Sequence, residues 1–117
     1  MGGVHAAPRV LVIEAELALA PGTDPRAPGA AVTTALCGHW EHEGPCRWPH
    51  HNAIAAEGAP ARLRTVVAPG DDADEVRRRV RAALAADPAW ELVRCGDSPV
   101  APGEEALARR LAEGPRA

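Results

Sequence analysis

Residues 62–95 read RLRTVVAPGDDADEVRRRVRAALAADPAWELVRC, and this stretch decides the fold. Leu63, Thr65 and Val67 alternate with Arg62, Arg64 and Val66, and such alternation is typical of a strand. Pro69-Gly70 ends that strand, and apolar residues then recur at the spacing of one helix face: Val76, Val80, Ala83 and Leu84. Asp87-Pro88 ends the helix, and residues 90–95 predict another strand. The stretch therefore predicts a strand–helix–strand unit.

The rest of the chain predicts further strands and a closing helix. Period-two alternation predicts a strand over residues 9–19, with Glu14 and Glu16 on its exposed face. Residues 20–29 are rich in Pro and Gly and predict a loop, whereas the β-branched residues in 31–37 predict a second strand. Residues 53–57 are ambiguous, and residues 104–113 predict a short helix. Together these elements predict an α+β fold: a small two-layer sandwich with a mostly antiparallel sheet of four to five strands and two helices, nearest to a ferredoxin-like arrangement.

The central helix carries charge in a pattern that matches its dipole. Asp71 or Asp72 is predicted to cap the helix, and Asp72 followed by Glu75 resembles a capping box. Four arginines follow the acidic first turn: Arg77, Arg78, Arg79 and Arg81. They are candidates for phosphate contacts, but acidic residues begin the same helix, so a solvated face is the preferred interpretation.

Length and composition bound the function. The 117 residues fit one domain, predicted over residues 9–114 after a flexible tail at 1–8. The net charge is −3 and lysine is absent, which makes nucleic-acid binding unlikely. The apolar segment 10–19 is too short to span a bilayer and residues 1–8 lack the pattern of a signal peptide, so no membrane association and a cytoplasmic location are expected.

The unusual chemistry lies between residues 36 and 51, which hold four of the five histidines, two of the three cysteines and two of the three tryptophans. Thiolate and imidazole groups at close spacing are typical of a zinc site, although copper and nickel also accept these ligands. There are six candidate ligands: Cys37, His39, His42, Cys46, His50 and His51. If residues 37–51 form a hairpin that reverses near Glu43-Gly44, alternation places four of them on one face. The preferred set is therefore Cys37, His39, Cys46 and His50, with His42 and His51 as substitutes, and the hairpin must bend for them to converge.

Other interpretations of this stretch remain open. In one alternative the cysteines are small core residues and the histidines lie in a solvated loop; in another, Cys37 and Cys46 form a disulfide. Cys95 is expected in the core. Trp40 and Trp48 are either an aromatic wall for a ligand or core residues in a chain without Phe or Tyr, and the second interpretation is favoured.

Three functions follow from these patterns. The leading hypothesis is a zinc-binding domain whose Cys/His loop orders a surface for a protein or small-molecule partner. The second is a metal-dependent hydrolase with Glu41 or Glu43 as general base. His39-x-Glu41 followed by Pro45-Cys46 is similar to part of the zinc nucleobase deaminase signature, but Pro49 stands where a second cysteine is required, which excludes that family. The third hypothesis is a metal-free interaction domain, with homo-oligomers joined at exposed strand edges.

Overall fold

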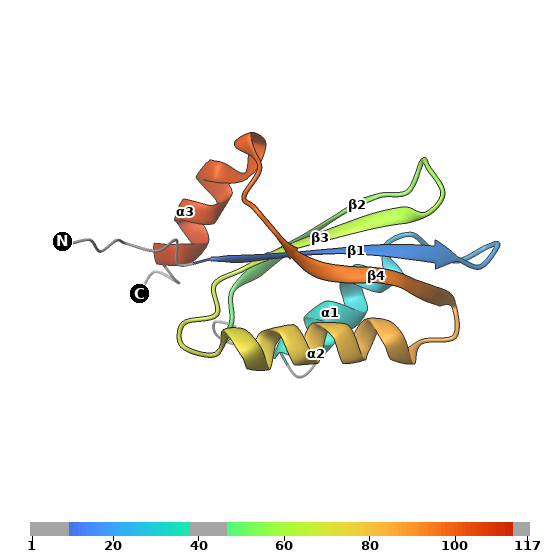
Figure 1. Ribbon diagram of the computed structural model, residues 1–117, viewed down its shortest axis with the longest axis horizontal. Coiled ribbons are helices and arrows are strands. Elements are labelled where there is room, and N and C mark those ends of the chain that lie inside the picture. Colours follow the sequence, from blue (N-terminus) through green and yellow to red (C-terminus); the bar gives the residue numbers. More distant parts are fainter. Residues whose placement is uncertain (1–9, 38–46, 114–117) are drawn as a thin grey trace.

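A single four-stranded sheet organises the molecule (Figure 1). The computed structural model describes residues 10–37 and 47–113. Its elements follow in this order: β1 (Leu11–Leu19), α1 (Ala27–Cys37), β2 (His50–Ala55), β3 (Ala61–Val67), α2 (Ala73–Ala86), β4 (Trp90–Ser98), the 3-10 helix η2 (Pro102–Glu104) and α3 (Glu105–Glu113). The sheet order is β2-β3-β1-β4 with every neighbouring pair antiparallel. The predicted α+β sandwich is confirmed, and the order β-α-β-β-α-β with this sheet is the ferredoxin-like arrangement.

Helices α1 and α2 cover one face of the sheet, and the core lies between them (Figure 1). Alternation along β1 explains this layering, because Leu11, Ile13, Ala15 and Leu17 are all buried on the helix side. The predicted strand at residues 9–19 is therefore confirmed, as are the strands that became β3 and β4.

Helix α2 is confirmed with the expected buried face, but not with the expected cap. Val76, Val80 and Leu84 are buried against the sheet. Asp72 stands at the N-cap position without a side-chain capping bond, so the predicted capping box is wrong. Its Oδ2 instead accepts a hydrogen bond from the indole Nε1 of Trp48, at 3.2 Å. The Asp72 carboxylate thus holds Trp48, which lies two residues before the start of β2.

The predicted strand at residues 31–37 is wrong, because these residues belong to helix α1. Pro28, Val32 and Leu36 follow one another at intervals of four and are the buried residues of this helix. Pro28 is tolerated because it lies in the first turn, where its missing N–H needs no helical partner. The β-branched residues are accommodated by packing, which outweighs their weak preference for strands. The helix begins at Ala27, so the last three residues of the loop predicted at 20–29 belong to the helix instead.

One further element departs from expectation in extent. Strand β2 begins at His50, so both His50 and His51 lie in a strand that pairs with β3. The predicted closing helix at residues 104–113 is confirmed as α3, which follows η2 and lies on the face of the sheet opposite α1 and α2 (Figure 1). There Ala108 packs against Val12 and Val66 in a second, smaller apolar cluster. In the part of the chain that the structure describes, no helix is long and apolar enough to cross a membrane.

Candidate binding site

Cys37 is the last residue of α1 and is disulfide-bonded. It does not lie in a strand, so Cys37 cannot belong to the strand hairpin on which the preferred ligand set was based. His39, His42 and Cys46 lie outside the described residues, as do Trp40, Glu41 and Glu43. The choice among the six candidate ligands therefore remains a prediction from residue type alone.

His50 takes part in a polar network between α1 and the sheet. Its Nδ1 lies 2.9 Å from the carbonyl oxygen of Trp48, and its Nε2 lies 2.9 Å from Oγ1 of Thr33. A carbonyl only accepts, so Nδ1 carries a proton in this arrangement, and in the neutral ring Nε2 accepts from the Thr33 hydroxyl. The Thr33 oxygen in turn accepts a hydrogen bond from Asn52, whose Oδ1 accepts one from the buried Thr65. A metal bound at either ring nitrogen of His50 would replace one of these bonds.

The remaining described candidate, His51, lies on the opposite face of β2. It is exposed and pairs in register with Val66, whereas His50 pairs with Val67 on the helix side. Within residues 10–37 and 47–113, no group of three or more His, Cys, Asp or Glu side chains is placed to hold a metal ion. The zinc hypothesis thus stays a prediction.

Trp48 is a core residue, which confirms the preferred interpretation for this tryptophan. Its side chain is 2% exposed. The guanidinium carbons of Arg47 and Arg79 lie 4.5 and 4.9 Å from the ring centroid, within the range of cation–π contacts. Together with the Asp72 bond, these contacts fix the entry of the chain into β2.

The four arginines of α2 each contact an acceptor in the same chain. Three form ion pairs and one donates to a backbone carbonyl: Arg77 with Asp74 and Asp97, Arg78 and Arg79 with Glu75, and Arg81 with the oxygen of Cys95. The preferred interpretation, a solvated face, agrees with this pattern, because these guanidinium groups already have acceptors.

The most distinctive surface is the sheet face that points away from α1 and α2, here called the open face. Strand register assigns these residues to it: Val12, Glu14, Glu16 and Ala18 of β1; His51, Ala53 and Ala55 of β2; Arg62, Arg64 and Val66 of β3; and Glu91, Arg94, Gly96 and Ser98 of β4. Helix α3 covers only one end, at Val12 and Val66. The middle of the open face is charged, and at the far end the exposed Glu91 lies opposite Ala18.

Arg64 forms a hydrogen-bond network at the end of the open face that α3 covers. Its Nε and Nη2 donate to the two carboxylate oxygens of Glu104 at 2.7 and 2.8 Å. Its Nη1 donates to Glu14 and Ser98, and Nη2 also donates to the carbonyl oxygen of Pro99. All five N–H groups are therefore used, and the paired geometry with Glu104 is the strong two-point form of this contact. The network joins η2 and α3 to β1, β3 and β4.

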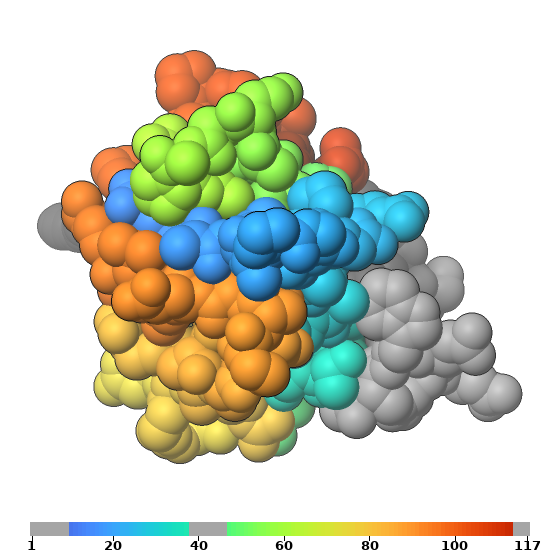
Figure 2. All heavy atoms as spheres, turned by 90° about the vertical axis from the view of Figure 1, so that its right-hand side faces the viewer, coloured from blue at the N-terminus to red at the C-terminus, as the bar shows by residue number. Residues whose placement is uncertain are grey.

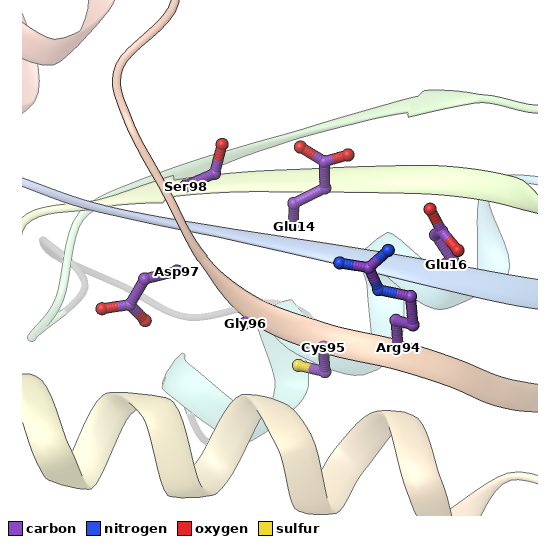
Figure 3. A pocket seen from close by; sticks show the side chains of 7 residues that line it. All are labelled: Glu14, Glu16, Arg94, Cys95, Gly96, Asp97 and Ser98. Atoms are coloured by element: carbon purple, nitrogen blue, oxygen red, sulfur yellow. The ribbon is translucent and has the colours of Figure 1, made fainter.

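Beside this network the open face holds a polar hollow of about 250 Å³ (Figure 3). The side chains of Glu14, Arg94 and Ser98 lie on the open side, whereas Cys95 and Asp97 lie toward α2 (Figure 3). The floor is Gly96, where an added Cβ would meet no atom within 4 Å. The missing side chain at this position of the strand leaves the space open.

An apolar hollow of about 460 Å³ lies next along β1. Ala18, Val93 and residues 58–61 line it, and Val93 is 49% exposed. Figure 2 views this end of the molecule, with the β2–β3 turn and β4 on either side of β1. Val93 is at the irregularity of β4, since the register with β1 shifts between Glu16 and Leu17. The polar and the apolar hollow share no lining residue, but they follow one another along β1 and β4, since Glu16 precedes Leu17 and Val93 precedes Arg94.

Two opposite charges at the border of these hollows lack a partner. Glu16 and Arg94 are directly opposite each other in the β1–β4 register. Within the described part of the chain, neither forms an ion pair or a side-chain hydrogen bond. In contrast, Glu14 is held by Arg62 at 3.0 Å and by Arg64 at 2.6 Å. Glu16 and Arg94 are therefore two neighbouring, oppositely charged groups of the open face that a ligand can engage without breaking an existing pair.

Sequence reasoning placed Glu14 and Glu16 on an exposed strand face but did not single out Arg94 or Gly96. The available signal was the alternation Arg94-x-Gly96-x-Ser98, in which a glycine interrupts the outward row of a strand. What the sequence does not show is that β4 lies beside β1. Without that neighbour, Glu16 and Arg94 are seventy-eight positions apart and unrelated.

Two groups near the open face, Glu104 and Cys95, have shifted pKa values. The hydrogen bonds from Arg64 lower the pKa of Glu104 to about 2, so this carboxylate stays ionised at neutral pH. Burial raises the pKa of the Cys95 thiol, which lowers its thiolate fraction. A general acid or base works best with a pKa near the operating pH, and a nucleophilic cysteine with a lowered one.

Comparison of the chain with models of known protein families, with curated proteins and with solved structures found no match.

Proposed function

We propose that the protein is a binding domain, and that its ligand occupies the uncovered part of the open face. The observation that carries the proposal is the unpaired Glu16 and Arg94 between two hollows, on a sheet face whose other end is sealed by α3. Small-molecule sites combine apolar lining with a few converging polar groups, and the two hollows supply both.

The proposal is a form of the third hypothesis, a metal-free interaction domain. It differs from that hypothesis because the binding surface is a face of the sheet and not an exposed strand edge. Edge pairing gains no support at β4, because Arg81 donates to the carbonyl oxygen of Cys95 at 2.6 Å and the strand is irregular at Val93. Both features hinder the addition of another strand. The zinc and hydrolase hypotheses rest on residues 37–51 and remain separate predictions.

A fragment screen by NMR tests the proposal. Isotope-labelled protein is titrated with small charged, polar and apolar compounds while the backbone amide signals are followed. We expect the shifted amides to cluster at Ala18, Val93, Arg94 and Gly96. Binding elsewhere, or none, would refute the proposal.

A matched pair of variants gives the control. Gly96→Val places a side chain in the polar hollow, where the added Cβ meets no atom within 4 Å, and valine suits a strand, so the fold should persist while binding is lost. Ala53→Val adds the same side chain to an exposed position of the same face, outside both hollows, and should bind as the parent does.

A further inference from the structure

We infer that the ligand of the open face is a small zwitterion with an apolar substituent, such as an α-amino acid with an aliphatic side chain. This inference rests on the proposed function and names its ligand class. It follows from three properties of the face: the opposite charges of Glu16 and Arg94, the apolar hollow next to them, and the position of α3 above one end of the face.

The charges call for a ligand that carries both signs. Arg94 offers a guanidinium group that binds carboxylates, and Glu16 offers a carboxylate that binds an ammonium group. A simple anion would meet Glu16, and a simple cation would meet Arg94, because these two residues are directly opposite each other. A ligand with a carboxylate and an ammonium group satisfies both at once.

The apolar space fixes the rest of the molecule. Ala18 follows Glu16 by two residues on the same face, about 7 Å along the strand at ~3.3 Å per residue. Val93 adjoins Arg94 in the chain and is the exposed large apolar side chain of the described residues. A ligand whose charged groups lie between Glu16 and Arg94 therefore directs a short apolar substituent toward Ala18 and Val93.

The position of α3 favours a small ligand over a second copy of the chain. Helix α3 lies above the open face at one end (Figure 1). A rotation that brings Glu16 of one copy onto Arg94 of the other, about an axis along the strands, also brings the two α3 helices together. The helices would then hold the charged centres apart, whereas a molecule of amino-acid size enters beside α3.

The test is an NMR titration of the full chain with four probes at equal ionic strength: leucine, N-acetylleucine, leucinamide and glycine. Leucine should shift the amides of Ala18, Val93, Arg94 and Gly96. N-acetylleucine lacks the ammonium group and leucinamide lacks the carboxylate, so each should bind roughly two- to fivefold more weakly, the worth of one exposed ion pair. Glycine keeps both charges but loses the apolar contact, and should bind up to roughly tenfold more weakly.

Two variants identify the partners. Arg94→Met should remove the preference for leucine over leucinamide, and Glu16→Gln should remove the preference for leucine over N-acetylleucine. Ala53→Val should change neither. Equal affinity for all four probes, or shifts that lie off the open face, would overturn the inference.

The two proposals fail in different ways. If library fragments bind at Val93 and Gly96 but leucine does not, the ligand class is wrong and the binding face stands. If size exclusion shows a dimer that Glu16→Gln dissociates, a second copy is the occupant and the ligand class is again wrong. If nothing binds the open face, both proposals fall.

Discussion

Replacement of Glu104 by glutamine should destabilise the protein in a manner that depends on pH. Glu104 is the last residue of η2 and directly precedes α3. Its carboxylate receives two hydrogen bonds from Arg64 and one from the backbone N–H of Ala101 at 2.9 Å. Its side chain is 17% exposed and that of Arg64 is 21% exposed, so solvent screens the pair only in part. Glutamine keeps the shape of the side chain and one acceptor oxygen but removes the charge.

The magnitude follows from the pKa of Glu104, which the Arg64 hydrogen bonds lower from the ordinary 4.5 to about 2. A difference of about 2.5 pKa units corresponds to about 3 kcal/mol of folding free energy at neutral pH. Because the pKa is lower in the folded protein, this stabilisation is complete well above pH 4.5 and is lost as the pH falls toward 2. At pH 3 the remaining contribution is about 1.5 kcal/mol.

Urea denaturation followed by tryptophan fluorescence measures this effect, since Trp48 and Trp90 are both buried. Glu104→Gln should lower the free energy of unfolding by about 3 kcal/mol at pH 7 and by about half as much at pH 3. Glu105→Gln, at the exposed next position, is the control and should change stability by less than about 0.5 kcal/mol. If Glu104→Gln lowers the free energy of unfolding equally at both pH values, or does not lower it at pH 7, the charge of Glu104 does not stabilise the fold through Arg64 and the reasoning is refuted.

Three other predictions concern groups away from the open face. Thr65→Val removes the hydroxyl that donates to Asn52 Oδ1 at 2.7 Å and should cost about 1–2 kcal/mol by urea denaturation, whereas Thr34→Val at an exposed helix position should cost less than half of that. Cys95 should react with iodoacetamide at pH 8 several-fold more slowly in the folded than in the urea-unfolded chain, since burial raises its pKa; equal rates would contradict this. If the zinc hypothesis is right, untagged protein purified in reductant should carry about one equivalent of zinc by elemental analysis, and Cys37→Ser should lower both zinc content and melting temperature; zinc-free folded protein would end that hypothesis.

The sequence was most informative where one face of an element is buried. The period-two pattern at residues 9–19 and the helical pattern of Val76, Val80 and Leu84 gave β1 and α2, because burial of a single face leaves its period in the sequence. Residues 27–37 carry a weaker signal. Their buried positions Pro28, Val32 and Leu36 are spaced as in a helix, but small and β-branched residues surround them and mask the contrast between the faces.

The candidate site was predictable only in part, since it depends on neighbours that are distant in sequence. The outward direction of Glu16 follows from alternation along its own strand. Its pairing with Arg94 depends on the antiparallel register of β1 and β4, and the hollow depends on the coincidence of Gly96 with Glu14 across that pair. The role of Glu104 likewise arises from a hydrogen-bonded partner forty residues away.

The chemistry of the two described cysteines explains why the charged face, and not the Cys/His stretch, carries the functional proposal. A zinc ligand must be a thiolate. Cys37 is disulfide-bonded, and burial raises the pKa of the Cys95 thiol, so neither presents a thiolate at neutral pH in this structure. A zinc site that includes Cys37 therefore requires reduction first, and its sulfur serves either the disulfide or the metal. Glu16 and Arg94 face no such choice, because neither side chain contains a thiol that a disulfide and a metal would compete for.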